Sequence, residues 1–88
     1  MENVASGNPL AGIVPVGVWM QEQAMTVFPT PKTWEYFRQA HRDELVKEGV
    51  LLLGSGRRSD YVDEVRIGQV VKDILVRESV ARLQQEGV

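Results

Sequence analysis

The chain has 88 residues and a formal net charge of −2; 43% of its residues are hydrophobic and 25% are charged. This length accommodates one domain with a modest core, and the composition is typical of a soluble globular protein rather than a disordered or fibrous one. The absence of cysteine excludes a disulfide framework and a thiolate metal site, and it agrees with a reducing cytoplasm.

The N-terminal part divides into a tail and an apolar segment. We expect residues 1–12 to form a flexible tail and residues 13–88 to form one domain. The apolar run over residues 9–20 is interrupted by Pro15 and by glycines and lacks a basic leader, which argues against a signal peptide or a membrane span. Residues 13–19 alternate in a way that predicts an extended segment, restricted by its proline to an edge strand or a packed arm. Because the sequence has no cysteine and its apolar run is neither a signal peptide nor a membrane span, we expect a cytoplasmic protein.

Residues 22–34, EQAMTVFPTPKTW, have the pattern of two helices joined by a turn. Ala24 and Val27 are three residues apart, which places them on one face of a first helix predicted over residues 21–28. Pro29 ends that helix, because a proline interrupts helical hydrogen bonding.

The start of the second helix is specified by its side chains. The hydroxyl of Thr30 can accept a hydrogen bond from the amide of residue 32 or 33, and Pro31 suits the first helical turn. We predict this helix over residues 31–48, with Gly49 in the position that follows a helix end.

The second helix has an apolar face and a polar face at 3.6-residue spacing. The face predicted to lie in the core consists of Trp34, Phe37, His41 and Leu45. The outward face consists of Lys32, Tyr36, Gln39 and Asp43, flanked by Glu35, Arg42 and Val46. Arg38 borders the core face, so we expect its stem to pack while its guanidinium reaches water.

A hairpin and a long helix follow. Residues 50–53 are predicted to form a strand, residues 54–56 a flexible turn, and residues 58–63 the returning strand. Asp63 is placed to cap a final helix predicted over residues 64–84.

The final helix has two apolar stripes. The stripe predicted to lie in the core consists of Ile67, Val70, Val71, Ile74 and Ala81. The second consists of Val76, Val80 and Leu83, and a domain of this size has little surface with which to cover it. We therefore expect self-association, either in solution or only when several copies line up on DNA. The pairs Asp73–Arg77 and Glu78–Arg82 have i,i+4 spacing and are expected to add about 0.2–0.5 kcal/mol each.

Eight residues of this chain match the opening pattern of a family of DNA-binding domains: Glu22, Ala24, Val27, Thr30, Pro31, Lys32, Thr33 and Trp34. This stretch resembles the excisionase and MerR-type winged-helix domains. Phe28 and Pro29 stand where that family usually has glycine and valine. The string GRRSDYVDEVRI resembles the family's wing, in which basic residues precede a tyrosine or aliphatic strand and an acidic cap. The implied fold is α+β, a small winged helix-turn-helix with a two-stranded wing and a long C-terminal helix.

The resemblance implies an architectural DNA-binding protein, an excisionase or recombination directionality factor that bends attachment-site DNA for a tyrosine integrase. Such a protein has no catalytic residues and needs no cofactor, metal or small-molecule ligand. We expect contacts to double-stranded DNA from Thr30, Lys32, Thr33, Tyr36, Gln39 and Arg42 of the second helix, and from Arg57, Arg58 and Ser59 of the wing.

Charge leaves alternatives open, because DNA-binding domains usually carry a basic excess. Residues 32–58 hold six basic and four acidic residues, which is compatible with DNA. A small phage or plasmid transcriptional regulator would use the same fold and residues. A protein-interaction module is favoured by the negative net charge and the second apolar stripe. An enzyme is disfavoured, because the single histidine, His41, has apolar neighbours and the adjacent carboxylates of Asp43 and Glu44 diverge on a helix.

Overall fold

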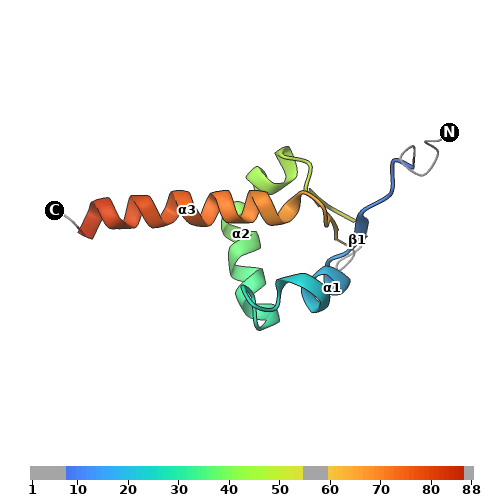
Figure 1. Cartoon of the computed structure of the whole chain (residues 1–88), viewed down its shortest axis with the longest axis horizontal. Coiled ribbons are helices and arrows are strands. Elements are labelled where there is room, and N and C mark those ends of the chain that lie inside the picture. The colour runs from blue at the N-terminus through green and yellow to red at the C-terminus, as the bar shows by residue number, and fades with distance from the viewer. Residues whose placement is uncertain (1–7, 55–59, 87–88) are drawn as a thin grey trace.

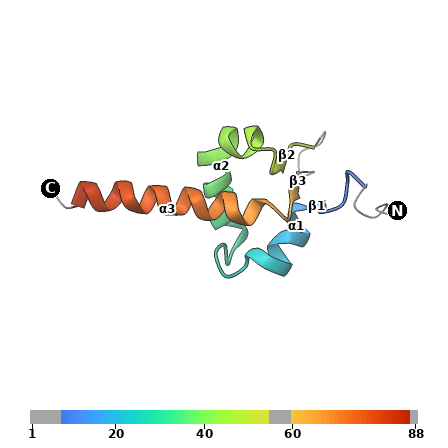
Figure 2. The same cartoon turned by 45° about the horizontal axis from the view of Figure 1, so that its top comes forward.

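A three-stranded antiparallel sheet and three α-helices make up the part of the chain that the computed structural model describes, residues 8–54 and 60–86 (Figure 1). The elements in chain order are β1 (Ile13–Pro15), α1 (Val16–Trp19), the π-helical turn η2 (Met20–Ala24), α2 (Pro31–Lys47), β2 (Leu51–Leu52), β3 (Tyr61–Asp63) and α3 (Ile67–Glu86). The strands gather near the N-terminal end of α3, whose C-terminal half extends away from the other elements (Figure 2). The predicted α+β class is confirmed.

β3 is the central strand of the sheet, with β1 on one side and β2 on the other. Val62 of β3 pairs with Val14 and with Leu51, and its side chain is fully buried. The predicted edge strand is confirmed, because β1 lies at an edge, where Pro15 is tolerated. The predicted two-stranded hairpin is therefore part of a three-stranded sheet. Its strands β2 and β3 are shorter than predicted within the described residues.

The first helix begins at Val16, five residues earlier than predicted, so the prediction of an extended segment through residue 19 is wrong. The reason is periodicity. Val16, Trp19, Met20 and Ala24 recur at spacings of three and four residues, which places them on one helical face. Trp19 and Ala24 are buried, and α1 continues directly into η2.

The same helix ends at Ala24, four residues before its predicted end. The amides of Val27 and Phe28 donate to the carbonyl oxygen of Ala24 at 3.0 and 2.7 Å. Val27, predicted to face inward with Ala24, is 49% exposed, whereas Phe28 is buried. The Phe28 ring lies 5.3 Å from that of Trp34 in an edge-to-face contact. Aromatic packing therefore holds the turn at Phe28, where the excisionase and MerR-type pattern usually has a glycine.

α2 ends within one residue of the predicted end but is bent in the middle. The bend is at His41, whose φ of −123° and ψ of 19° are not helical. No proline or glycine marks the position in the sequence. After the helix, Gly49 has a φ of 79°, in the left-handed region where glycine is favoured, as predicted.

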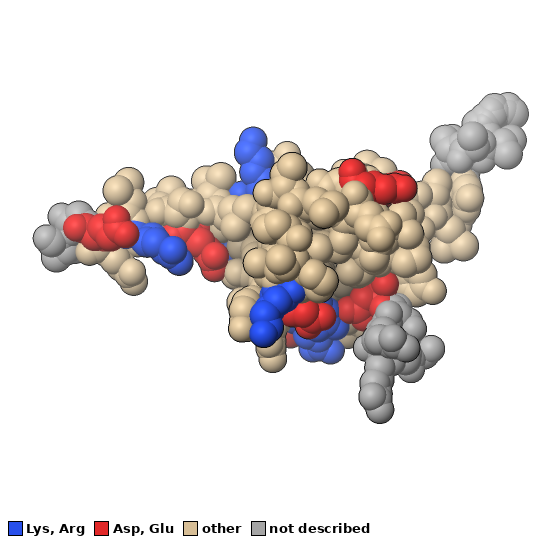
Figure 3. Space-filling view, turned by 90° about the horizontal axis from the view of Figure 1, so that it is seen from below, with Lys and Arg blue, Asp and Glu red and all other residues tan. Residues whose placement is uncertain are grey.

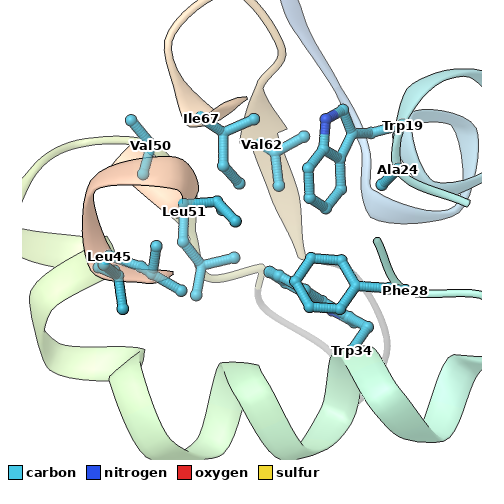
Figure 4. Close-up of a cluster of buried hydrophobic side chains, with 11 residues drawn as sticks. Trp19, Ala24, Phe28, Trp34, Leu45, Val50, Leu51, Val62 and Ile67 are labelled. Atoms are coloured by element: carbon cyan, nitrogen blue, oxygen red, sulfur yellow. The ribbon is translucent and has the colours of Figure 1, made fainter. Parts of the chain in front are cut away.

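The core joins an aromatic part to an aliphatic part (Figure 4). Trp19, Phe28 and Trp34 pack together, and the rings of Trp19 and Trp34 lie 5.2 Å apart at 72°. The aliphatic part consists of Leu45, Val50, Leu51, Val62, Ile67, Val71 and Ile74, and the small side chain of Ala24 belongs to the same buried cluster. Of the predicted core face of α2, Trp34 and Leu45 are buried, while Phe37 and His41 are partly buried.

α3 begins at Ile67, three residues later than predicted. Asp63 Oδ1 accepts hydrogen bonds from the amides of Val65 and Arg66 at 3.1 and 3.3 Å, so this aspartate caps the turn that leads into the helix. The predicted core stripe is buried or partly buried as far as Ile74. Ala81, predicted in the same stripe, is exposed because α3 has by then left the other elements (Figures 1 and 2).

Candidate nucleic-acid interface

Two threonines close the N-terminal end of α2. The Thr33 amide donates to Thr30 Oγ1 at 3.3 Å, and the Thr30 amide donates to Thr33 Oγ1 at 3.3 Å. The predicted N-cap at Thr30 is therefore confirmed. Pro31 has no N–H, and the Trp34 amide reaches the Thr30 carbonyl at 3.5 Å. Within the described residues, the first-turn amide left for an anion is that of Lys32, whose side chain is exposed.

Lys32, Tyr36 and Gln39 form an exposed row along the first half of α2. Their i, i+4, i+7 spacing places them on one face, over a length of about 10 Å. All three are exposed, and Tyr36 retains 65% of its accessible surface. The opposite face is held in the core by Trp34. Their shared exposure was expected from the sequence, and their contact with DNA stays a prediction.

Arg42, also predicted to contact DNA, lies beyond the bend in α2. The non-helical backbone at His41 means that Arg42 does not continue the row of residues 32–39 in one straight helix. Arg42 Nη1 is 3.8 Å from Asp43 Oδ1, and 49% of the arginine side chain is exposed. The arginine is accessible, but a neighbouring carboxylate offsets its charge.

The second half of α2 binds α3 through two polar side-chain contacts. His41 Nε2 lies 3.0 Å from Glu78 Oε2. Arg77 donates two hydrogen bonds to the carboxylate of Glu44, at 2.9 and 2.7 Å. The hydrogen bond from Arg77 lowers the pKa of Glu44 below its ordinary value and raises the pKa of Arg77. The bend at His41 thus accompanies a change of direction that brings α2 against α3.

These contacts replace the ion pairs predicted within α3. The prediction of the Asp73–Arg77 and Glu78–Arg82 ion pairs is wrong, because Arg77 and Glu78 bind side chains of α2 instead. Asp73 accepts a hydrogen bond from Gln69 Nε2 at 2.8 Å. Spacing along one helix identified groups that can pair, but the tertiary partners have the shorter contacts.

Arg38 binds Asp60 rather than reaching water, which corrects the prediction for its guanidinium. Arg38 Nε and Nη2 both lie 2.7 Å from Asp60 Oδ2, and the two side chains are 24% and 20% exposed. A charged group this far removed from water needs a partner, and the residue just before β3 provides it. The pair forms part of the wall of a groove of about 430 Å³ between α1 and α2, where Glu35 adds a negative charge beside the row.

The predicted wing contacts, Arg57, Arg58 and Ser59, lie outside the described residues. The strands that flank them are described, and they pair Leu51 with Val62 and Leu52 with Tyr61. Because Leu51 and Val62 are buried in the same core as α2, the base of the hairpin has a fixed position relative to the row.

The face of the molecule that Figure 3 presents does not carry one continuous basic area among its described residues. Figure 3 shows lysine and arginine side chains next to acidic ones on the face that it presents. Arg38 and Arg77 bind carboxylates, and Arg66 donates to the carbonyl oxygen of Glu48 at 2.8 Å. Lys32 and Lys47, near the two ends of α2, are exposed and form no ion pair with another described residue.

The second apolar stripe of α3, predicted to mediate self-association, is exposed. Val76, Val80 and Leu83 keep 52%, 50% and 67% of their accessible surface. They lie on the part of α3 that extends from the other elements (Figure 1). Their role in self-association stays a prediction.

In residues 8–54 and 60–86, no three histidine, aspartate or glutamate side chains are grouped so that they could hold a metal ion. None of the helices described combines the length and hydrophobicity needed to span a bilayer.

Comparison of the chain with protein-family models, with curated proteins and with solved structures finds no match. The resemblance to excisionase and MerR-type domains therefore rests on the residues quoted from the sequence.

Proposed function

We propose that this chain binds double-stranded DNA as a winged helix-turn-helix protein, with α2 in the major groove and the β2–β3 hairpin as the wing. The element order supports this, since two helices joined by a turn are followed by a hairpin and a third helix. The observation that carries the proposal is the exposed row of Lys32, Tyr36 and Gln39 on a half-helix that Trp34 anchors in the core.

The row offers three kinds of contact to a duplex. Lys32 provides a positive charge for a phosphate, and the hydroxyl of Tyr36 can reach a phosphate or a base edge. Gln39 has an amide that can pair with N6 and N7 of adenine. A row of about 10 Å spans about three base-pair steps. One α2 therefore reads a short site, to which Arg57 and Arg58 are expected to add shape-dependent contacts in the minor groove.

Electrostatics should contribute modestly to this binding. The net charge is −2, and Arg38 and Arg77 are engaged by carboxylates of their own chain. Four basic side chains belong to the proposed interface: Lys32, Arg42, Arg57 and Arg58. The log of the affinity is expected to fall with the log of salt by no more than about 3.6, at about 0.9 for each phosphate neutralised.

The first test is fluorescence anisotropy with the DNA that flanks the protein's own gene, over a range of salt concentrations. Lys32→Ala should weaken binding and reduce the salt slope by about 1, whereas Lys47→Ala, at the other end of the same helix, should change neither.

Tyr36→Ala should cost about 1–3 kcal/mol of binding free energy and alter sequence preference if Tyr36 reads a base, while Arg58→Ala should weaken binding evenly across sequences. Circular dichroism must first show that each variant folds.

Equal affinities for Lys32→Ala, Tyr36→Ala, Arg58→Ala and the parent chain would contradict this docking. Absence of any binding at low salt would contradict DNA binding itself. That result would favour the second candidate, a protein-interaction module, which the net charge of −2 and the exposed stripe on α3 support.

Among DNA-binding functions, the family resemblance favours an excisionase that acts with a tyrosine integrase. A small phage or plasmid transcriptional regulator would use the same surface, so the proposed contacts do not distinguish the two. A tyrosine integrase encoded beside this gene would support the excisionase, because directionality factors act together with their cognate recombinase.

A further inference from the structure

Apart from the contacts of Arg77 and Glu78 with α2, the C-terminal half of α3 has little of its own chain beside it. Every residue from 75 to 86 is exposed, and Figures 1 and 2 show this part extending away from the other elements. An unpacked helix of about 12 residues is only marginally stable in water. Val76 and Val80 are β-branched, which lowers helix propensity further. This half of the helix therefore gains stability from any partner that covers it.

The apolar side chains of this half lie opposite the core. Val76 follows the buried Ile74 by two residues, which turns it by about 200° around the helix axis. Val80 and Leu83 follow at spacings of four and three, the spacing of core positions in a coiled coil. Asp73, three residues before Val76, is the next position of the same stripe toward the sheet. It is polar and accepts a hydrogen bond from Gln69, so the apolar stripe ends there. The exposed surface is thus a short seam for one other helix.

The charges beside the stripe indicate which helix fits. Lys72, Ser79 and Glu86 recur every seven residues along one flank, so Lys72 and Glu86 lie seven residues on either side of Ser79. If a second copy of α3 packs antiparallel to the first, the same flank of each helix lies beside that of the other, with the residue order reversed. Ser79 then lies opposite Ser79, and Lys72 of each copy faces Glu86 of the other. In a parallel pair, Lys72 would instead face Arg77 of the other copy, which is a like-charge contact.

We infer that α3 pairs antiparallel with α3 of a second copy of this chain, with Val76 of each copy packed against Val80 of the other. On the opposite flank this register brings two Arg77 side chains near each other. Each is already bound by Glu44 of its own chain at 2.9 and 2.7 Å, so their repulsion is largely offset. The interface is isologous, because the same surface is used by both copies. This pairing does not depend on DNA binding.

The association is tested by sedimentation of the full chain over a concentration series, without DNA. The mass should rise from 9.9 kDa to twice that value as concentration increases. Val80→Glu places a charge in the seam and should raise the midpoint of dimerisation by at least about tenfold. Ala81→Glu introduces the same charge one residue along, turned about 100° away from the seam, and should leave the midpoint unchanged.

The orientation is tested by charge exchange and by cross-linking. Lys72→Glu and Glu86→Lys should each weaken the dimer, and the double variant should restore it, whereas a parallel pair would be strengthened by Lys72→Glu. The chain has no cysteine, so Ser79→Cys introduces a single thiol at the centre of the flank. With oxidised glutathione, Ser79→Cys should form a covalent dimer and Ala81→Cys should not.

Three results would overturn the pairing: a monomer at concentrations up to ~1 mM, a dimer that Val80→Glu leaves intact, or cross-linking through Ala81→Cys in preference to Ser79→Cys. Circular dichroism establishes folding for each variant. If Val80→Glu fails to fold, the two cysteine variants decide the matter, because each changes only one small exposed side chain.

Discussion

At the scale of single residues, the threonines at the start of α2 have a measurable consequence. Thr30→Ala removes the Oγ1 acceptor of the Thr33 amide, at 3.3 Å, and should cost about 1 kcal/mol of stability. For a domain of this size, that loss lowers Tm by roughly 4–8 °C. Thr26→Ala, an exposed threonine in the preceding turn, is the matched control and should change stability little. Urea unfolding of both variants measures the difference, and equal losses would contradict a capping role for Thr30.

The residues whose roles were predictable act over short stretches of chain. Thr30 caps an amide three residues away, Gly49 adopts a positive φ directly after a helix, and Asp63 accepts from amides two and three residues on. The Arg38–Asp60 pair spans 22 residues, so its geometry depends on where the hairpin returns. The sequence shows that Arg38 borders an apolar face but contains no local signal for its partner.

At the scale of elements, the positions of α2, β3 and most of α3 were predictable because their periodicity and breakers agree. The predicted start of the first helix was wrong because residues 13–19 are compatible with both the two-residue period of a strand and the 3.6-residue period of a helix. Their alternation favours a strand, while the three- and four-residue spacing from Val16 to Ala24 favours a helix. Burial of Trp19 and Ala24 decides for the helix. The bend at His41 was not predictable, since it accompanies contacts to Glu78 and Arg77, which are distant in sequence.

The Glu44–Arg77 contact between α2 and α3 makes stability depend on pH. Its hydrogen bond lowers the pKa of Glu44 from the ordinary value of 4.5, with a smaller lowering by the charges of Arg77 and His41. A carboxyl group with a lowered pKa in the folded state stabilises the fold above its ordinary value and loses that effect as pH falls through the lowered value. Glu44→Gln should therefore be less stable than the parent at pH 7, and the difference should shrink below about pH 4.5.

Thermal unfolding of the parent and Glu44→Gln between pH 7 and pH 3 provides the measurement. Asp43→Asn is the matched control, because this neighbouring carboxylate is 86% exposed and lies 3.8 Å from Arg42. A stability difference for Glu44→Gln that is the same at both ends of the pH range would show that lost packing, and not ionisation, causes it.

At the scale of the whole molecule, the two proposed surfaces lie on different elements. The row of Lys32, Tyr36 and Gln39 belongs to α2, and the seam of Val76 and Val80 belongs to the extending half of α3. A row of about 10 Å contacts only about three base pairs, which gives one molecule little sequence information. Pairing through α3 would couple two such rows, so that a dimer recognises two short sites together.

Coupled binding to adjacent sites would change DNA geometry, and this is the output that an excisionase requires. Bending a site of 20–30 base pairs by 40–90° costs on the order of 1–6 kcal/mol, which the added contacts of α2 and the wing must offset. We expect the parent chain to bend its own flanking DNA in a circular-permutation gel shift and to stimulate excision by the cognate integrase. Lys32→Ala should reduce both effects, whereas Lys47→Ala should reduce neither. A promoter-reporter assay on the same DNA separates the alternatives. Excision that proceeds equally well without this protein, combined with a changed reporter signal, would reject the excisionase and support the transcriptional regulator.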